Sequence, residues 1–173
     1  MQQFVVTAVG PDRPGIVEQL TAHLHQAGGN VLDSRMANLR GQFTVMMLIE
    51  ADDGAAAALH PSLTALAEGI GLRLTLTDAG PRPRVVSGLP FQLKTYSLDQ
   101  PGIVHRVSEL LRARGVNIEE LTTRQASAPF AGGLLFLMEM RLTVPSQVPI
   151  RELRAELQTL CDTLNCDLDF EPA

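Results

Sequence analysis

The sequence predicts an α+β protein built from two copies of one βαββαβ unit, each with a four-stranded antiparallel sheet and both helices on one face. A repeated motif indicates the duplication, because Asp12-Arg13-Pro14-Gly15-Ile16-Val17 returns 87 positions later as Asp99-Gln100-Pro101-Gly102-Ile103-Val104. Three further pairs match at the same spacing: Gly28 with Gly115, Asn30 with Asn117, and Val31 with Ile118. Self-similarity at a fixed spacing is typical of a repeated structural unit. Helical and alternating apolar patterns follow the same order in both halves, which predicts the fold of each unit.

The first half contains four strand patterns and two helical patterns. Residues 4–9 form a β-branched run, and apolar residues then recur at helical spacing over about 13 residues until Gly28-Gly29. Strand patterns over 30–36 and 43–49 flank residues 39–42, which have the composition of a hairpin turn. The last two elements are a helix over 55–66, which Pro61 must kink or split, and a strand over 72–76.

The second half repeats this order after a proline-rich stretch. The expected strands cover 91–97, 117–124, 134–144 and 167–171, and the expected helices begin after Gly102 and at Pro149. The expected domains are residues 1–79 and 91–173, joined by a linker over 80–90. Residues 125–133 form a longer connection than their counterpart in the first half, and they can be a lid, a contact arm or a tolerated insertion.

This order of elements is the ferredoxin-like arrangement, in which the helices cover one sheet face and leave the other bare. Either the sheets of the two copies meet, or the copies pair edge to edge into one larger sheet, or a second chain covers the bare face. Because such a sheet has free edges and an uncovered face, we expect a homo-oligomer.

Each repeated motif predicts a tight turn between a strand and a helix. Pro14 suits the first helical position, and Asp12 can accept hydrogen bonds from the free amides of the first turn. Gly15 leaves those amides uncovered, so the helix start can also accept a carboxylate or a phosphate. From the residues alone, a well-capped turn and an anion site both fit. Glycine is not required after a proline at a helix start, so Gly15 is expected to be replaceable without loss of the fold.

Composition excludes several classes of protein. A net charge of −5 and a single lysine, Lys94, argue against direct binding of nucleic acid, which depends on clustered basic residues. No apolar run approaches the ~20 residues of a membrane span and the first residues lack a signal-peptide pattern, so we expect a cytoplasmic protein without membrane contact. Cys161 and Cys166 have no second cysteine pair and no nearby histidine to complete a zinc site, so both are expected to be buried or idle thiols.

No pattern in the sequence predicts an enzyme. There is no nucleophile elbow, no phosphate-binding loop and no zinc-protease motif, so no catalytic residue, metal or cofactor is expected. His23, His25 and His60 share no ligand spacing with an acid or a thiol and are expected at the surface. His105 lies in the first turn after Gly102, where it could face a ligand, although a solvated position is expected. The methionines of the strand patterns are expected in the core or an interface: Met36, Met46, Met47, Met138 and Met140.

Two such units, each with Asp-x-Pro-Gly-Ile-Val at the first helix and Gly-x-Asn-Val/Ile at the second strand, resemble the ACT domain, a regulatory module that binds amino acids. With Asp33-Ser34-Arg35-Met36 and Gln42-Phe43-Thr44-Val45-Met46-Met47-Leu48 as well, the first copy is similar to the family of tandem ACT regulators that includes glycine cleavage repressors.

The resemblance implies a ligand between two modules, contacted by the loop before the first helix and by the start of the second strand. The implied residues are Asp12, Pro14, Gly15, Ile16, Asn30 and Val31 in the first copy, and Asp99, Gly102, Ile103, Asn117 and Ile118 in the second. The helix amides would take the carboxylate of an amino acid, and an Asn amide oxygen or a carboxylate would take its ammonium group.

The resemblance also implies a function. It favours an amino-acid-responsive repressor that acts through a protein partner such as a DNA-binding activator, with glycine or serine as the favoured ligand. The alternative is a trans-acting allosteric subunit of an amino-acid metabolic enzyme, which the sequence does not separate from the first. The first copy matches the family motif more closely, so we expect it to bind the ligand.

Overall fold

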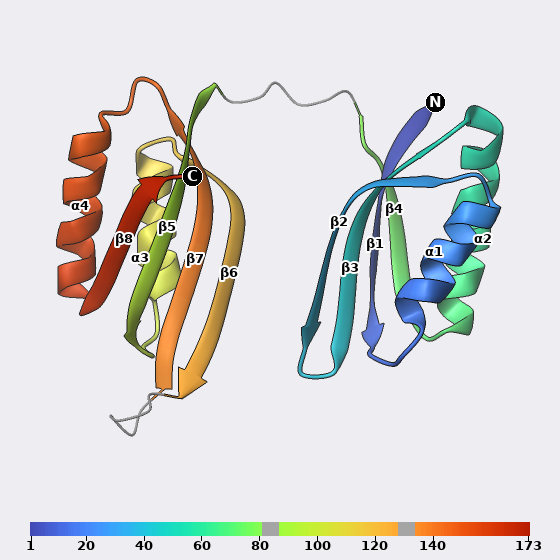
Figure 1. Ribbon diagram of the computed structural model, residues 1–173, viewed down its shortest axis with the longest axis horizontal. Coiled ribbons are helices and arrows are strands. Elements are labelled where there is room, and N and C mark those ends of the chain that lie inside the picture. The colour runs from blue at the N-terminus through green and yellow to red at the C-terminus, as the bar shows by residue number, and fades with distance from the viewer. Residues whose placement is uncertain (81–86, 128–133) are drawn as a thin grey trace. The chain divides into compact units, whose positions relative to one another are not determined.

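The computed structural model describes residues 1–80, 87–127 and 134–173, and it divides into two compact units, Met1–Pro83 and Arg84–Ala173 (Figure 1). The first unit consists of β1 (Gln2–Pro11), α1 (Ile16–Gln26), β2 (Asn30–Leu39), β3 (Gln42–Ala51), α2 (Asp53–Gly69) and β4 (Arg73–Asp78). The second unit consists of β5 (Gly88–Leu98), α3 (Ile103–Ala113), β6 (Asn117–Ser127), β7 (Leu134–Pro145), α4 (Ile150–Thr163) and β8 (Cys166–Pro172). The predicted α+β class and βαββαβ order are confirmed.

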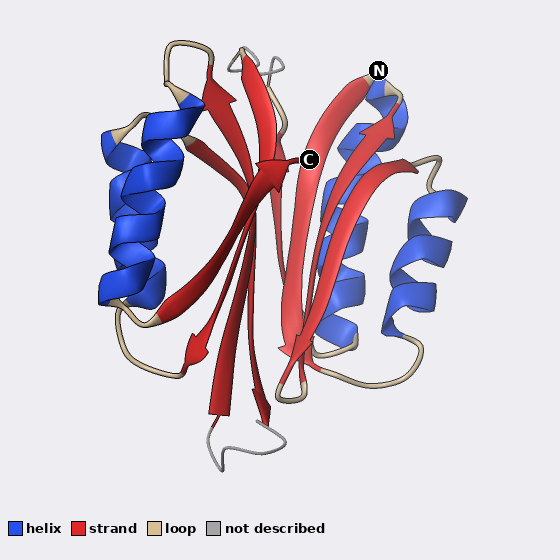
Figure 2. Ribbon diagram, turned by 60° about the vertical axis from the view of Figure 1, so that its left-hand side comes forward, coloured by secondary structure: helices blue, strands red, loops and turns tan. Residues whose placement is uncertain are grey.

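Each unit has one antiparallel sheet, with strand order β2-β3-β1-β4 in the first and β6-β7-β5-β8 in the second. Within each unit, both helices lie on the same face of the sheet, as predicted (Figure 2). β1 and β5 are hydrogen-bonded on both sides, so their alternate residues point into the layer between sheet and helices. Each unit therefore has its own hydrophobic core between its sheet and its helices.

The core of the first unit joins alternate residues of β1 and β3 to the apolar stripes of the two helices. Its most deeply buried members include Val6, Ala8, Ile16, Leu20, Leu24, Ile49, Leu59 and Leu63. The second core joins β5 and β7 to α3 and α4 in the same way, and it includes Leu93, Ile103, Val107, Leu111, Met138, Met140, Leu142 and Leu157. Because each unit buries its own apolar residues, each positions its first loop independently.

The hairpin predicted at 39–42 is confirmed. Arg40 and Gly41 have φ angles of 52° and 79°, so both central residues adopt left-handed backbone, as a two-residue type I′ turn requires. This turn joins β2 to β3 in tight register, with Leu39 opposite Gln42. The corresponding connection in the second unit differs, because residues 125–127 continue β6 and residues 128–133 lie outside the described part of the chain.

Helix α2 is one continuous helix from Asp53 to Gly69, so Pro61 does not split it, which was one of the two outcomes predicted at this position. Proline removes one hydrogen bond, the one to the carbonyl of Ala57, four residues earlier. Pro61 and Ala57 are both exposed, so water can hydrate that carbonyl. Leu59 and Leu63 on the other side of the helix are fully buried and hold it against the sheet.

Strand β5 begins at Gly88, three residues before the start expected from the apolar pattern. Pro90 lies inside this strand and pairs with Thr143 of β7. Its carbonyl accepts a hydrogen bond from the backbone N–H of Ala173, the last residue, at 3.1 Å. The nitrogen of Pro90, which has no hydrogen to donate, therefore lies beside Ala173, just past the last residue pair between β5 and β8. The proline interrupts no hydrogen bond within the paired part of these strands.

The sulfur-containing residues divide between core and surface. Cys161 and Cys166 are free, buried thiols, in agreement with the sequence prediction, and burial raises the pKa of Cys161 to about 11. Met47, Met138 and Met140 lie in the cores, whereas Met36 and Met46 are more than half exposed. Met36 lies on the edge strand β2, and Met46 points to the sheet face without helices, which explains their exposure.

Gly10 in β1 is expected to resist substitution. A Cβ built on it would lie 2.6 Å from the carbonyl oxygen of Gly71 and 2.7 Å from a methyl of Leu72. Gly10→Ala should lower the free energy of unfolding by about 1–3 kcal/mol, because a clash with backbone is not relieved by rotating a side chain. Gly69→Ala is the control, since nothing lies within 4 Å of that position. Chemical denaturation measures both variants, and wild-type stability of Gly10→Ala would contradict this close approach.

Candidate ligand site

The loop between β1 and α1 carries the repeated motif of the first unit. Helix α1 begins at Ile16, and Gly15 is its N-cap residue with φ 92° and ψ −5°. The prediction that Pro14 is the first helical residue is therefore wrong, because the left-handed turn at Gly15 separates the proline from the helix. Only glycine adopts this conformation without strain, so Gly15 is required for the turn.

The second unit repeats this geometry. Helix α3 begins at Ile103, and Gly102 is its N-cap residue with φ 98° and ψ −6°. Pro101 and Gly102 are exposed, as Pro14 and Gly15 are in the first unit. Ile16 and Ile103, which are among the implied residues, are each 1% exposed and belong to the two cores.

Asp12 does not cap α1, contrary to the sequence prediction. Its carboxylate accepts a hydrogen bond from the side-chain amide of Asn38 near the end of β2. Asn38 in turn accepts one from the backbone N–H of Gly41 at 3.1 Å, and the N–H of Asp12 donates to the carbonyl of Gly41 at 2.8 Å. The carboxylate is therefore tied to the β2–β3 hairpin.

Asp99 is held in the same way in the second unit. The side-chain amide Nε2 of Gln125 donates to its carboxylate at 2.5 Å, and the N–H of Asp99 donates to the carbonyl of Leu134 at 3.0 Å. This unit adds one contact, because the side-chain amide of Gln100 donates to the carbonyl of Leu164 at the end of α4. Its loop is therefore fixed to two neighbouring elements.

These contacts leave the helix starts uncovered. Among the residues that the structure describes, neither N-cap residue makes a side-chain cap hydrogen bond to α1 or α3, and the carboxylates of Asp12 and Asp99 are bound elsewhere. The first amides of a helix have no partner within the helix and carry partial positive charge. Each helix start can therefore offer N–H donors to an anionic group.

The other implied residues lie at the opposite end of the unit. Asn30 begins β2 and pairs with Glu50, which pairs with Gln3, whereas the loop follows Pro11 at the far end of β1. At ~3.3 Å per residue, these two positions along β1 are about 26 Å apart. Figure 1 shows the β1–α1 and α1–β2 connections at opposite ends of the unit. One unit therefore does not bring the two groups of implied residues together.

The second unit has the same separation. Asn117 pairs with Thr143, which pairs with Pro90, and the α3 loop follows Leu98 at the other end of β5. Val31 and Ile118 follow the two asparagines and each precedes a shift in strand register, at Val31/Asp33 and at Ile118/Glu120. The extra residue at this irregularity is Leu32 in the first unit and Glu119 in the second.

Glu119 gives the second unit a carboxylate that the implied residues did not include. The side chain of Asn117 donates a hydrogen bond to it at 2.6 Å. This bond, and a further one from Thr143, lower the pKa of Glu119, so it is ionised at neutral pH. With the amide nitrogen of Asn117 occupied, Glu119 and the amide oxygen of Asn117 are two acceptors suited to an ammonium group. In the sequence, this difference is visible as Leu32 in the first copy and Glu119 at the equivalent position of the second, and it indicates that only the second copy has a carboxylate there.

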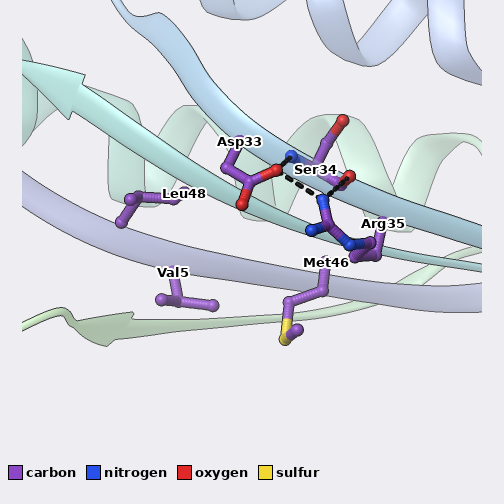
Figure 3. A pocket seen from close by; sticks show the side chains of 6 residues that line it. All are labelled: Val5, Asp33, Ser34, Arg35, Met46 and Leu48. Carbon is purple, nitrogen blue, oxygen red and sulfur yellow. Dashed lines mark hydrogen bonds and ion pairs between the residues drawn. The ribbon is translucent and has the colours of Figure 1, made fainter. Parts of the chain in front are cut away.

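A hollow of about 100 Å³ lies on the face of the first sheet that has no helices (Figure 3). It is lined by Val5, Asp33, Ser34, Arg35, Met46 and Leu48, and none of the implied ligand residues is among them. Asp33 accepts from the Arg35 guanidinium at 2.5 Å and from the backbone N–H of Ser34 at 2.8 Å. This acid and base thus neutralise one another inside the hollow.

The histidines form no metal or catalytic cluster, and the described residues contain no group of three or more metal-ligating side chains. His25, His60 and His105 are exposed, as expected. His23 is half-buried instead, because its Nε2 lies 2.9 Å from the hydroxyl of Ser62 and bridges α1 to α2. No helix in the described ranges is long and apolar enough to cross a membrane.

Comparison with known proteins identifies this arrangement. A family model described as an ACT domain matches residues 2–77. The chain is a tandem ACT-domain protein. It is 29% identical over 164 residues to the glycine cleavage system transcriptional repressor of Escherichia coli. The aligned residues make up 94% of this chain and 85% of that protein.

Two solved structures share the tandem arrangement. One is a protein described as unknown from Galdieria sulphuraria, with 32% identity, a TM-score of 0.84 and coverage of 99% of this chain and 98% of that chain. The other is a candidate glycine cleavage system transcriptional repressor, with 25% identity, a TM-score of 0.72 and the same coverage. The likeness therefore extends over both ACT units.

The left-handed glycines give a prediction that reverses the expectation from sequence. Gly15→Ala and Gly102→Ala should each lower the free energy of unfolding by about 1–2 kcal/mol, because a Cβ is unfavourable at these φ angles. Steric contact is a minor factor, since a Cβ at Gly102 meets nothing within 4 Å and one at Gly15 lies 3.3 Å from Gln19. Thermal denaturation measures the loss. A variant as stable as the wild type would place the helix start at the proline.

Proposed function

We propose that this chain is an amino-acid-responsive repressor of a glycine cleavage system that acts through contact with a protein. The observation that carries the proposal is the likeness over 94% of the chain to the Escherichia coli repressor. The uncapped helix starts support it chemically, because they offer N–H donors to a carboxylate. The role is binding and regulation without catalysis, in the cytoplasm, where such a repressor acts.

The proposed ligand is glycine or serine, held between two ACT modules. The loop residues Asp12, Pro14 and Gly15, or their counterparts in the second unit, would place the helix amides against the ligand's carboxylate. The ammonium group would meet the start of β2 or β6 of another module, at Asn30 or at Asn117 with Glu119. A second module is needed because the two groups lie at opposite ends of one unit.

The proposed protein partner is a DNA-binding activator whose action the repressor blocks. The chain is acidic, with a net charge of −5 and one lysine, and specific binding of duplex DNA needs many Lys and Arg contacts with phosphates. Contact with a protein that itself reads DNA satisfies the regulatory role without such contacts.

Calorimetry with glycine and serine tests the ligand. We expect saturable binding, and at a glycine concentration of 100 times Kd the protein should gain about 2.7 kcal/mol of stability by mass action. Acetate and methylamine, each with only one of the two charged groups, are the controls and should not bind measurably. Asn30→Ala and Asn117→Ala separate the units, because the variant in the working unit should bind about 10-fold to 100-fold more weakly. No binding of any of a full panel of amino acids would contradict the proposal.

A gel shift with the purified protein tests the absence of direct DNA contact. We expect no saturable binding to duplex DNA at physiological salt, because the chain lacks clustered basic residues. With the DNA-binding activator added, the protein should shift the activator–DNA complex. A specific complex with DNA alone at nanomolar protein would contradict this part of the proposal, and co-purification with a metabolic enzyme in place of an activator would favour a regulatory subunit.

A further inference from the structure

We propose that Asn38 is a positioning residue of the first ligand loop. Its side chain fixes Asp12 to the β2–β3 hairpin, and so sets where the first-turn amides of α1 are presented. This inference rests on the proposed function for the identity of the ligand, glycine. The contact between Asn38 and Asp12 is present in the protein without ligand. Asn38 belongs to no motif that the family resemblance supplied.

The orientation of the Asn38 amide follows from its two hydrogen bonds. The backbone N–H of Gly41 donates to its oxygen at 3.1 Å, which leaves its nitrogen directed at the Asp12 carboxylate. The nitrogen can only donate and the carboxylate can only accept, so the pair is matched in one orientation. The backbone bond from Asp12 to Gly41 at 2.8 Å lies beside it and completes a closed set of contacts.

The second unit supplies an independent instance of the same contact. Gln125 occupies the position equivalent to Asn38, and it donates to Asp99 just as Asn38 donates to Asp12. In both units the donor residue pairs with a phenylalanine of the next strand, Phe43 or Phe136. The contact is present although the two connections differ in length and the side chains differ by one methylene. An amide donor facing the motif aspartate is therefore a shared feature of both loops.

This contact has two consequences for the proposed site. First, it directs the Asp12 carboxylate to the hairpin, so the carboxylate does not occupy the helix amides that the sequence predicted it would cap. Second, it links the loop to β2, the strand that begins with Asn30 and Val31. The loop is thus joined to the end of β2 that lies opposite Asn30 and Val31.

The first loop depends on Asn38 more than the second depends on Gln125. In the second unit Gln100 also donates to the carbonyl of Leu164, and this gives the loop a second side-chain tether. Arg13 stands at the equivalent position in the first unit, is exposed and makes no side-chain hydrogen bond or ion pair within the described ranges. The matched change at Gln125 should therefore have the smaller effect on its own loop.

The test exchanges the two side chains. Asn38→Asp places two carboxylates together and breaks the contact, whereas the double variant Asp12→Asn with Asn38→Asp restores a donor and an acceptor in reversed order. In that double variant, Asp at position 38 can still accept from the N–H of Gly41. Gln125→Glu is the matched control in the second unit.

Two measurements are made on each variant. Amide hydrogen exchange of residues 15–18 by NMR, without ligand, should speed up in Asn38→Asp and return toward the wild-type rate in the double variant. Calorimetry with glycine should show affinity about tenfold weaker in Asn38→Asp, as expected for loss of a hydrogen bond to a charged group, and largely restored in the double variant. The midpoint of thermal unfolding should change little, because both side chains are exposed.

The outcomes separate the two proposals. Unchanged exchange rates in Asn38→Asp would overturn the positioning role, whether or not glycine binds. Altered amide hydrogen exchange with unchanged glycine affinity would also overturn the positioning role. So would a double variant whose glycine affinity is not restored. If the wild-type protein binds no glycine while the exchange rates respond as expected, the proposed ligand fails and the loop geometry stands.

Discussion

The left-handed backbone at Gly15 and Gly102 is the constraint on which the loop before the first helix of each unit depends. It turns the chain sharply from the central strand into the first helix, so that Ile16 and Ile103 enter the core one residue later. The same turn keeps the proline outside the helix and leaves the first amides without a covering side chain. Burial of the isoleucine and the lack of a side-chain cap on the helix are therefore two results of one backbone conformation.

The length of the central strand sets a second constraint. Because the α1 loop and the start of β2 lie at opposite ends of β1, the two groups of implied ligand residues cannot meet within one unit. In the proposed ligand site, each module would therefore contribute one half at each end. Ligand binding across modules would then depend on how modules associate, and this connects binding to regulation without any catalytic group.

The two units keep one fold while their loops differ in chemistry. The first has an exposed arginine where the second has Gln100 tied to α4, and a leucine where the second has the ionised Glu119. These differences lie at the strand irregularity and in the loop, outside both cores. The two units therefore share the packing that positions their first loops, while the polar groups of these loops differ.

The sequence by itself determined the duplication, the order of elements and the hairpin at Arg40 and Gly41, because these follow from local periodicity and turn chemistry. It did not determine the partner of Asp12. Local chemistry allowed that carboxylate to cap α1, and only the folded sheet brought Asn38, from the far end of β2, within hydrogen-bonding distance. Tertiary packing also decided the outcome at Pro61, since burial of Leu59 and Leu63 keeps α2 continuous where the local rule allowed either a kink or a split.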